Sequence, residues 1–394
     1  MKWASTLSRQ PDTAAALEEA ATAVEQQLGA DPPDLLVAFF SPDHLDRSER
    51  IASLAQRRFP GAVFIGCGGG GVIGDAHEAE DGPAVSLIAA VLPGVAVSPF
   101  HVDMTALPPP DAGASPWRAI TGAAPERDPQ FLVLADPFTM DASALITGLD
   151  RAYPDAPKIG GLASGGARVG ENRLLLGSSV QRTGAIGVAL SGDVAIETMI
   201  AQGCRPIGKP MIVTRCHGGL LQELDQRRPI DVLTELYGSV DDRDRGLMRH
   251  SLFLGLEMHA DEVEYSPGEL LVRNLLGAEK ETGAFVVGGE LRPMTVVRFV
   301  LRDARAADED LRRMLSAHRA GQKRPPAGAL LFSCLGRGAG LFGRPDHDTG
   351  LFQQELGPAP LGGFFCNGEI GPVGGRTFVH GYTSAFALFR ERRT

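Results

Sequence analysis

The chain has 394 residues, of which 43% are hydrophobic and 22% charged, the composition of a globular protein with room for two or three domains. Its net charge of 38 − 48 = −10 argues against nucleic acid and anionic membrane surfaces as default partners. The N-terminus lacks the apolar segment of a signal peptide, and no run of about 18 apolar residues could span a membrane. The five cysteines are scattered without zinc-site spacing, so we expect thiols in a reducing, cytoplasmic compartment and no metal site.

The first predicted elements are one helix and one strand–helix–strand unit. Asp12 is a typical N-cap for a helix that ends near Gly29, so we expect residues 1–30 to form an N-terminal helix packed on the first domain. The elements expected next are a strand at 35–40, a helix at 44–58, a strand at 62–65, the glycine-rich stretch 66–71, and a hairpin of strands 85–92 and 95–104.

The same order of elements recurs twice. The second copy comprises a strand at 131–135, a helix at 142–153, the glycine-rich stretch 158–166, and a hairpin of strands 184–190 and 194–201. The third comprises a strand at 329–334, a short helix near 350–356, and the stretch 361–373. This alignment makes Cys67, Gly161 and Cys366 equivalent. It predicts an α/β fold with mixed parallel and antiparallel sheets covered by helices, in which glycine-rich tips lie at strand C-termini, where α/β folds bind ligands.

Between the second and third copies the pattern changes. Helical or mixed segments are expected at 230–237 and 245–254, strands at 270–275, 285–287 and 295–302, and a helix at 307–318. The charged run 225–229 interrupts the pattern before this region. We therefore predict two domains, 31–226, which contains the first two copies, and 227–394.

The glycine-rich stretch 66–71 satisfies G-x-G-x-x-G, the dinucleotide-binding fingerprint. That fingerprint requires a helix to begin at the glycines, so that the helix N-terminus can hold the pyrophosphate. The following residues, 72–82, are short, acidic and without helical spacing, and no P-loop motif occurs in the chain. We therefore expect no nucleotide cofactor, and no cofactor of another kind.

Two charged residues follow strand ends in the third copy. Arg337 lies at the tip of its first strand, and Glu369 lies in a glycine-punctuated turn after the apolar run 361–366. An arginine fork binds a carboxylate and a carboxylate binds an ammonium, so the two would suit a zwitterion such as an amino acid. The alternative is that Arg337 and Glu369 pair with each other and only connect two loops.

The cysteines of the third copy allow a second hypothesis. Cys366 or Cys334 could act as a nucleophile with His380 as the base, which would make the protein a thiol-dependent hydrolase. No third orienting residue is evident, and buried cysteines mostly behave as small apolar residues, so catalysis is the less favoured alternative. A third possibility is an interaction scaffold with a vestigial pocket.

Several stretches resemble one protein family. Residues 363–384 (G-F-F-C-N-G-E-I-G-P-V-G-G-R-T-F-V-H-G-Y-T-S), 332–338 with Asp348 after them, and 270–277 resemble the FIST C-terminal domain. Residues 65–74, 160–166 and 202–208 resemble the FIST N-terminal domain. The chain leaves no room for a kinase, receiver, cyclase or F-box segment, so we expect a stand-alone FIST protein.

The resemblance implies a sensory module that binds a small ligand, with amino acids among the candidates. We expect a cytoplasmic protein that binds an amino acid or related metabolite and acts in signal transduction through a separate partner. The family implies no catalytic residues, so the expected site comes from the chemistry above. The residues expected to line it are Arg337, Glu369, Asn367, Cys366, Cys334, Gly68, Gly69, Ser164 and Arg205.

Overall fold

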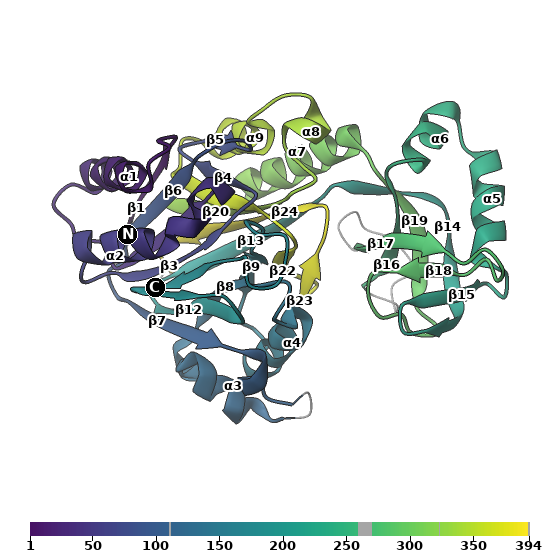
Figure 1. The fold of residues 1–394 in the computed structure, drawn as a ribbon, viewed down its shortest axis with the longest axis horizontal. Coiled ribbons are helices and arrows are strands. Elements are labelled where there is room, and N and C mark those ends of the chain that lie inside the picture. Colours follow the sequence, from purple (N-terminus) through teal and green to yellow (C-terminus); the bar gives the residue numbers. More distant parts are fainter. Residues whose placement is uncertain (110–111, 259–269, 323, 393–394) are drawn as a thin grey trace. The chain divides into compact units, whose positions relative to one another are not determined.

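The computed structural model describes residues 1–109, 112–258, 270–322 and 324–392, and the chain forms two compact units (Figure 1). The first unit comprises residues 1–200, 312–379 and 383–394, and the second comprises 201–311 and 380–382. The first unit thus contains all three predicted copies, called repeats below. The second unit is inserted within the third repeat, so the compact units divide the chain differently from a single boundary near residue 226.

The elements of the repeats follow one plan. The first repeat contains β1 (Lys2–Ser8), α1 (Thr13–Leu28), β2 (Leu35–Phe40), η1 (Pro42–Arg47), α2 (Ser48–Arg58), β3 (Val63–Gly68), β4 (Gly71–Gly74), β5 (His77–Ala79) and β6 (Val85–Val91). The second contains β7 (Val95–Val102), η2 (Met104–Ala106), α3 (Ala114–Thr121), η3 (Pro125–Arg127), β8 (Gln130–Ala135), α4 (Ala142–Ala152), β9 (Lys158–Leu162), β10 (Leu174–Leu176), β11 (Ser179–Gln181) and β12 (Ala185–Gly192). The third contains β13 (Ala195–Gln202), α7 (Ala304–Gly321), β20 (Gly328–Cys334), α8 (Ala339–Phe342), α9 (His347–Leu356), β21 (Leu361–Cys366), β22 (Glu369–Val373), β23 (Arg376–His380) and β24 (Thr383–Arg390).

Each repeat contributes to two of three six-stranded sheets. The sheet orders are β1-β6-β2-β3-β10-β11, β7-β12-β8-β9-β22-β23 and β13-β24-β20-β21-β4-β5. The short hairpin of each repeat therefore leaves its own sheet and extends a neighbour's, in a closed cycle around the unit. The central pairs β2–β3, β8–β9 and β20–β21 are parallel and the β6, β12 and β24 neighbours are antiparallel, which confirms the predicted mixed α/β fold.

One glycine in each repeat fixes the structural alignment. Gly66, Gly160 and Gly363 are each paired in register with the preceding parallel strand, and a Cβ on them would lie 2.2, 1.8 and 1.9 Å from that strand's carbonyl oxygen. Counting from these glycines makes Cys67 and Gly161 equivalent, as expected. Their equivalent in the third repeat is Phe364, and Cys366 lies two residues further on, so that part of the expected alignment was wrong.

Two expected hairpins are not hairpins. β6 pairs with β1 and β2, whereas β7 pairs with β12 in another sheet. In the same way β12 and β13 belong to different sheets. The tight turns at Pro93-Gly94 and near Asp193 instead pass the chain from one sheet to the next. A short turn between two strands indicates a reversal of the chain, but it does not say which strand becomes the hydrogen-bonding partner.

The N-terminal residues are partly strand. Asp12 caps α1 as predicted, because its carboxylate accepts from the Ala14 and Ala15 N–H groups, both at 3.0 Å. Residues 1–30 do not form one helix, however, because Lys2–Ser8 form β1 and pair with β6. Trp3 and Ala4 are buried in this strand, so burial within the sheet accounts for its position.

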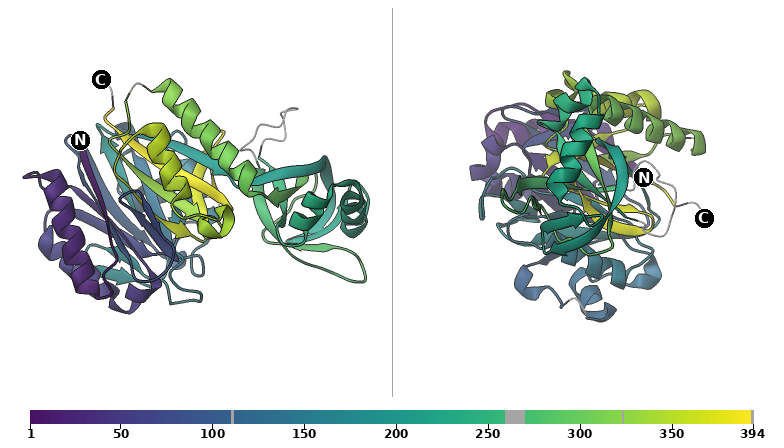
Figure 2. Two further views of the ribbon diagram at one scale, coloured as in Figure 1. Left: turned by 90° about the horizontal axis from the view of Figure 1, so that it is seen from above. Right: turned by 90° about the vertical axis from the view of Figure 1, so that its right-hand side faces the viewer.

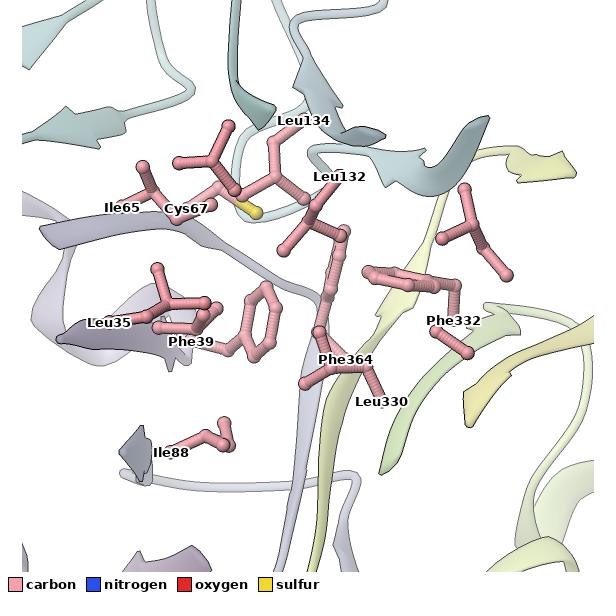
Figure 3. Close-up of a cluster of buried hydrophobic side chains, with 14 of the residues drawn as sticks. Leu35, Phe39, Ile65, Cys67, Ile88, Leu132, Leu134, Leu330, Phe332 and Phe364 are labelled. Atoms are coloured by element: carbon pink, nitrogen blue, oxygen red, sulfur yellow. The ribbon is translucent and has the colours of Figure 1, made fainter. Parts of the chain in front are cut away.

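The core of the first unit lies between the inner faces of the three sheets. Figure 3 shows this cluster, to which β2, β3, β8, β20 and β21 contribute side chains such as Phe39, Cys67, Leu134, Phe332 and Phe364. The outer face of each sheet is covered by helices, as α1 and α2 on the first sheet show in Figures 1 and 2. The strand tips are therefore held on both faces by packed side chains.

The second unit is a small barrel. Its elements are β14 (Cys204–His217), β15 (Leu220–Leu224), α5 (Pro229–Ser239), α6 (Asp242–Met248), β16 (Leu252–Glu257), β17 (Leu270–Ala278), β18 (Phe285–Val287) and β19 (Val296–Arg302). The strands close in the order β14-β15-β18-β17-β16-β19 around an apolar core. The long strand β14 was not expected from the sequence. Within the described part of the chain, no helix combines the length and apolar character of a membrane span.

Candidate functional site

The glycine-rich tips of the three repeats meet in the first unit and are bonded to one another. The Ser164 N–H donates to the Gly68 carbonyl at 3.1 Å, and the Asn367 N–H donates to the Leu162 carbonyl at 3.0 Å. The Ser164 hydroxyl donates to the Phe365 carbonyl, which joins the second repeat to the third. The fold thus brings several of the predicted site residues together, from all three repeats.

Close packing accounts for the glycines in these tips. A Cβ on Gly68 would lie 2.7 Å from the Leu45 side chain, and one on Gly69 would lie 2.7 Å from the Gly71 carbonyl oxygen and 3.0 Å from Phe364. Glycine permits this approach of chain to chain, as it permits the approach of a ligand. Here the space beside the tips is filled by neighbouring segments of the protein.

Arg337 is buried, with 2% of its surface exposed, and its guanidinium is held by Asp348. Nε and Nη2 donate to the two carboxylate oxygens at 2.8 and 3.0 Å, and the guanidinium carbon lies 5.2 Å from the centre of the Phe342 ring. The alternative in which Arg337 and Glu369 only pair with each other is therefore wrong, because α9 places Asp348 over the end of β20. The remaining nitrogen, Nη1, is buried without a hydrogen-bond partner.

Asp348 is the centre of a buried polar cluster beneath α9. It accepts a hydrogen bond from the Ser384 hydroxyl, and the His347 ring nitrogen Nδ1 lies 2.7 Å from its Oδ1. Burial alone would raise the pKa of Asp348, but Arg337 and these hydrogen bonds hold that pKa below its usual value. The Arg337–Asp348 pair is accordingly ionised in the folded protein.

Glu78 on β5 lies near this cluster. One of its oxygens accepts from the Thr349 N–H at 2.9 Å, at the start of α9. Burial and repulsion from Asp348 raise the pKa of Glu78 to about 7. Because β5 belongs to the first repeat, this contact joins the exchanged hairpin to the third repeat.

Glu369 is fully buried and has its own set of partners. Its Oε2 accepts from the Thr383 N–H at 3.1 Å and from the Thr383 hydroxyl at 2.7 Å, and its Oε1 lies 3.2 Å from the Cys366 sulfur, which donates to it. Burial raises the pKa of Glu369 to about 7, although these hydrogen bonds and the charge of Arg337 oppose the shift. The carboxyl therefore changes its protonation state near neutral pH.

The position of Glu369 is apolar in the other repeats. In the sheets Glu369 pairs with Gly161, Val72 pairs with Phe364, and Leu174 pairs with Cys67. Gly161, Phe364 and Cys67 are equivalent residues of the three repeats, so Val72 and Leu174 occupy the place that Glu369 occupies. Val72 and Leu174 both belong to the central apolar core. A carboxyl at this place is not needed to fill the core, so it marks the third repeat as chemically different.

The other predicted residues lie in different surroundings. Cys366 is buried, and burial raises the pKa of its thiol well above the usual range, so this thiol stays protonated unless a neighbouring base removes its proton. Cys334 is partly exposed at the end of β20, and His380, the expected base, is a buried residue grouped with the second unit. Arg205 also belongs to the second unit, where Nε donates to Asp303 at 2.7 Å and the other nitrogens contact Asp244.

A cavity of the first unit lies at the other end of a sheet, beside the N-terminal ends of β8 and β9. Its volume is about 480 Å³. Its charged lining residues are Arg118, Asp128, Asp155 and Arg392, and its other lining residues include Gln130, Tyr153, Ile196 and four prolines, Pro125, Pro129, Pro154 and Pro157. None of these residues belongs to a motif, and five separate segments form the cavity, so no sequence pattern predicts it.

Residues 34–227 match the FIST N domain and residues 229–372 match the FIST C domain. The uncharacterized protein Rv0628c of Mycobacterium tuberculosis is 36% identical over 385 residues, which cover 97% of this chain and 98% of that protein. The uncharacterized protein Mb0898c of Mycobacterium bovis is 36% identical over 383 residues, 96% of each chain.

Among solved structures, a cyanuric acid hydrolase from A. caulinodans aligns over 100% of both chains, with a TM-score of 0.36 and 10% identity. A likeness of this size carries no conclusion about fold or activity. The two domain matches cover most of the chain in the order expected from the sequence. The chain belongs to the FIST family, whose domains are generally sensory, ligand-binding domains.

Proposed function

We propose that the protein is a cytoplasmic sensor that binds an amino acid or a related metabolite and passes the signal to a separate partner protein. The observation that carries this proposal is the cavity of about 480 Å³ beside β8 and β9. Its volume lies within the range of small-molecule sites, which is roughly 300–1,000 Å³.

The rim of the cavity favours a preformed site. Four of its lining residues are prolines, whose fixed φ restricts the loops before β8 and after α4. The floor is also fixed: the Gln130 amide donates to the Val194 carbonyl at 2.7 Å, and the Tyr153 hydroxyl donates to the Ala123 carbonyl at 2.8 Å. A cavity that is already ordered loses less conformational entropy when it binds a ligand.

The charges of the lining favour a zwitterion. Arg118 uses Nη2 to donate to the Ala152 carbonyl at 3.3 Å, which leaves further donors of its fork for a ligand carboxylate. The Asp155 carboxylate and the C-terminal end of α4, which ends at Ala152, both favour a ligand ammonium. Arg392 bonds to Asp128 at 3.0 Å and forms another part of the wall.

A thermal-shift screen of the full chain against amino acids and central metabolites tests the proposal. A ligand at 100 times its Kd should add about 2.7 kcal/mol to the stability. Calorimetry should then show that Arg118→Met and Asp155→Asn each weaken binding of the identified ligand about tenfold or more, since each removes a charge-assisted hydrogen bond. Arg118→Lys should also bind poorly, because an ammonium does not reproduce the fork.

Two further variants separate the possible sites. Arg57→Met, an exposed arginine on α2, is the matched control and should bind normally. Binding that is lost in the double variant Arg337→Met with Asp348→Leu, which replaces the buried pair by apolar residues, but kept in Arg118→Met would place the ligand at the buried cluster below α9 instead. A screen in which amino acids produce no stabilisation, and another class of metabolite does, would contradict the proposed ligand class.

A further inference from the structure

The third repeat holds two thiols on neighbouring strand ends. Cys334 is the last residue of β20 and Cys366 the last residue of β21, and the two are paired in register in the parallel ladder. Two residues earlier, the paired Phe332 and Phe364 rings contact each other, with centroids 5.8 Å apart, on the face to which both cysteines also point. Both cysteines are thiols in the structure.

The backbone distance suits a disulfide. Neighbouring strands lie about 4.8 Å apart, within the Cα separation of roughly 4.4–6.8 Å that disulfides span. The Leu335 N–H donates to the Cys366 carbonyl at 3.1 Å, so the chain beyond Cys334 is held against Cys366. The equivalent pairs in the other repeats, Ser41/Gly69 and Asp136/Ala163, contain no cysteine.

The two cysteines have neighbours of opposite charge, the Arg337 guanidinium near Cys334 and the Glu369 carboxyl beside Cys366. The Arg337 N–H donates to the Cys334 carbonyl at 2.9 Å, so this arginine follows Cys334 in a tight turn, and the two side chains interact electrostatically. A nearby cation favours a thiolate. The Cys366 sulfur donates to Glu369 Oε1 at 3.2 Å, and the pKa of that carboxyl, raised to about 7 by burial, suits a base at neutral pH.

We propose that Cys334 and Cys366 form a redox site at which a hydroperoxide converts the two thiols into a disulfide, with Glu369 as the base. Partly exposed Cys334 is the residue that meets the oxidant, and buried Cys366 is the resolving cysteine. This inference concerns a different part of the first unit from the ligand cavity and does not depend on the proposed function.

The reaction balances in two steps. The Cys334 thiolate attacks the distal oxygen of the hydroperoxide, the O–O bond breaks, and the alcohol leaves after it takes up a proton, which gives a sulfenic acid on Cys334. Cys366 then transfers its proton to Glu369 and attacks the Cys334 sulfur, the S–O bond breaks, and the hydroxide leaves as water with that proton. Two thiols are oxidised, and one hydroperoxide is reduced to an alcohol and water.

The disulfide would change the surroundings of Glu369. It removes the thiol that donates to Oε1 and ties the end of β20, and so the segment that leads to Arg337, to β21. Oxidation would thus act directly on the buried charges of the third repeat.

Treatment of the full chain with hydrogen peroxide tests this site. Mass spectrometry should find a disulfide-linked Cys334–Cys366 peptide in the natural protein and in the control Cys216→Ser, whose cysteine lies in the second unit. In Cys366→Ser, Cys334 should instead be trapped as a sulfenic acid by dimedone. Glu369→Gln should slow disulfide closure by about 100-fold at neutral pH, with the sulfenic acid accumulating.

Two results would overturn the proposal. One is oxidation of Cys334 that is no faster than that of Cys216. The other is a natural protein in which Cys334 is oxidised without a bond to Cys366. The central test uses the natural protein and the cysteine variants, so it does not require that Glu369→Gln folds.

Discussion

The third repeat of the first unit has a backbone equivalent to those of the first two repeats, but it buries side chains of a different chemical kind. The place of Glu369 is taken by Val72 and Leu174 in the other repeats. The third repeat buries the Arg337–Asp348 pair, whereas the second buries a lysine, Lys158, whose ammonium contacts Asp150 of α4 at 2.8 Å. Symmetric packing explains the shared backbone. It does not explain buried charges, which weaken a core unless each is paired. Chemistry in this unit is therefore to be sought where the repeats differ.

The largest effect should come from the backbone that the repeats share. Gly160→Ala and Gly363→Ala should each prevent folding, because the new Cβ would lie 1.8 or 1.9 Å from a backbone carbonyl oxygen that cannot move without breaking the sheet. Circular dichroism and soluble yield measure this. Gly61→Ala, where the Cβ would meet no atom within 4 Å, is the control and should fold. Normal folding of Gly363→Ala alone would show that the third repeat is built differently.

The second effect concerns the pair that distinguishes the third repeat. Arg337→Met should destabilise the first unit by about 3–5 kcal/mol, because it leaves Asp348 charged and buried without its partner. The double variant Arg337→Met with Asp348→Leu should recover most of that loss, since an apolar pair of similar volume fits the same space. Urea unfolding followed by tryptophan fluorescence is suitable, because Trp3 and Trp117 both lie in the first unit. A double variant as unstable as the single one would contradict this account.

The third effect is a pH dependence that Glu369 brings to the third repeat. Its pKa is raised from 4.5 to about 7, so the folded protein keeps a proton that the unfolded chain loses. The free energy of unfolding should therefore fall by about 3 kcal/mol for this group as the pH rises from about 4.5 to about 7. Above that pH it should level off.

Glu369→Gln should make the dependence on pH shallower without removing it, because the pKa of Glu78 is raised to about 7 as well. Unfolding midpoints measured from pH 5 to pH 8 in both proteins test this. An unchanged slope would mean that Glu369 is charged throughout this range in the folded protein.

The smallest effect compares two helices, α9 and α4, that cover equivalent sheets. Gly350 in α9 has open space where a Cβ would lie, so Gly350→Ala should stabilise the protein by about 1 kcal/mol through helix propensity. Gly148 in α4 faces Trp117, whose ring a Cβ would approach to 2.1 Å, so Gly148→Ala should destabilise it. Thermal unfolding of the two variants should give shifts of opposite sign.

Local features of the fold were accessible from the sequence. The strand at 35–40 and the N-cap Asp12 were predicted from apolar patterning and from the chemistry of a carboxylate before a helix. The hydrogen-bonding partners of the strands β6, β7, β12 and β13 were not predicted, because strand pairing depends on contacts between residues far apart in the chain. β1 was missed for the same reason, since it is a strand only by pairing with β6.

The candidate site was predicted in part. Arg337 and Glu369 were singled out as charges that need partners, and both have them, but the partners are Asp348 for the first and Thr383 and Cys366 for the second. Asp348 was noted only through the family resemblance, because its approach to Arg337 depends on the path of α8 and α9. The proposed ligand cavity had no signal in the sequence, since separate loops and ends of helices and strands rather than a motif form it.

Because the short hairpin of each repeat joins the sheet of another repeat, the order of synthesis limits when each sheet can be completed. β4 (Gly71–Gly74) pairs with β5 on one edge, but the partner of its other edge is β21 (Leu361–Cys366), some 290 residues later. At about 5–20 residues per second, roughly 15–60 s of synthesis separate the two strands. During that time an apolar hairpin edge has no sheet to join, and unpaired edges are prone to association with other chains. Two of the three sheets, those that contain strands between β20 and β24, can close only near the end of translation, which makes the nascent protein a natural client for chaperones that shield exposed strands.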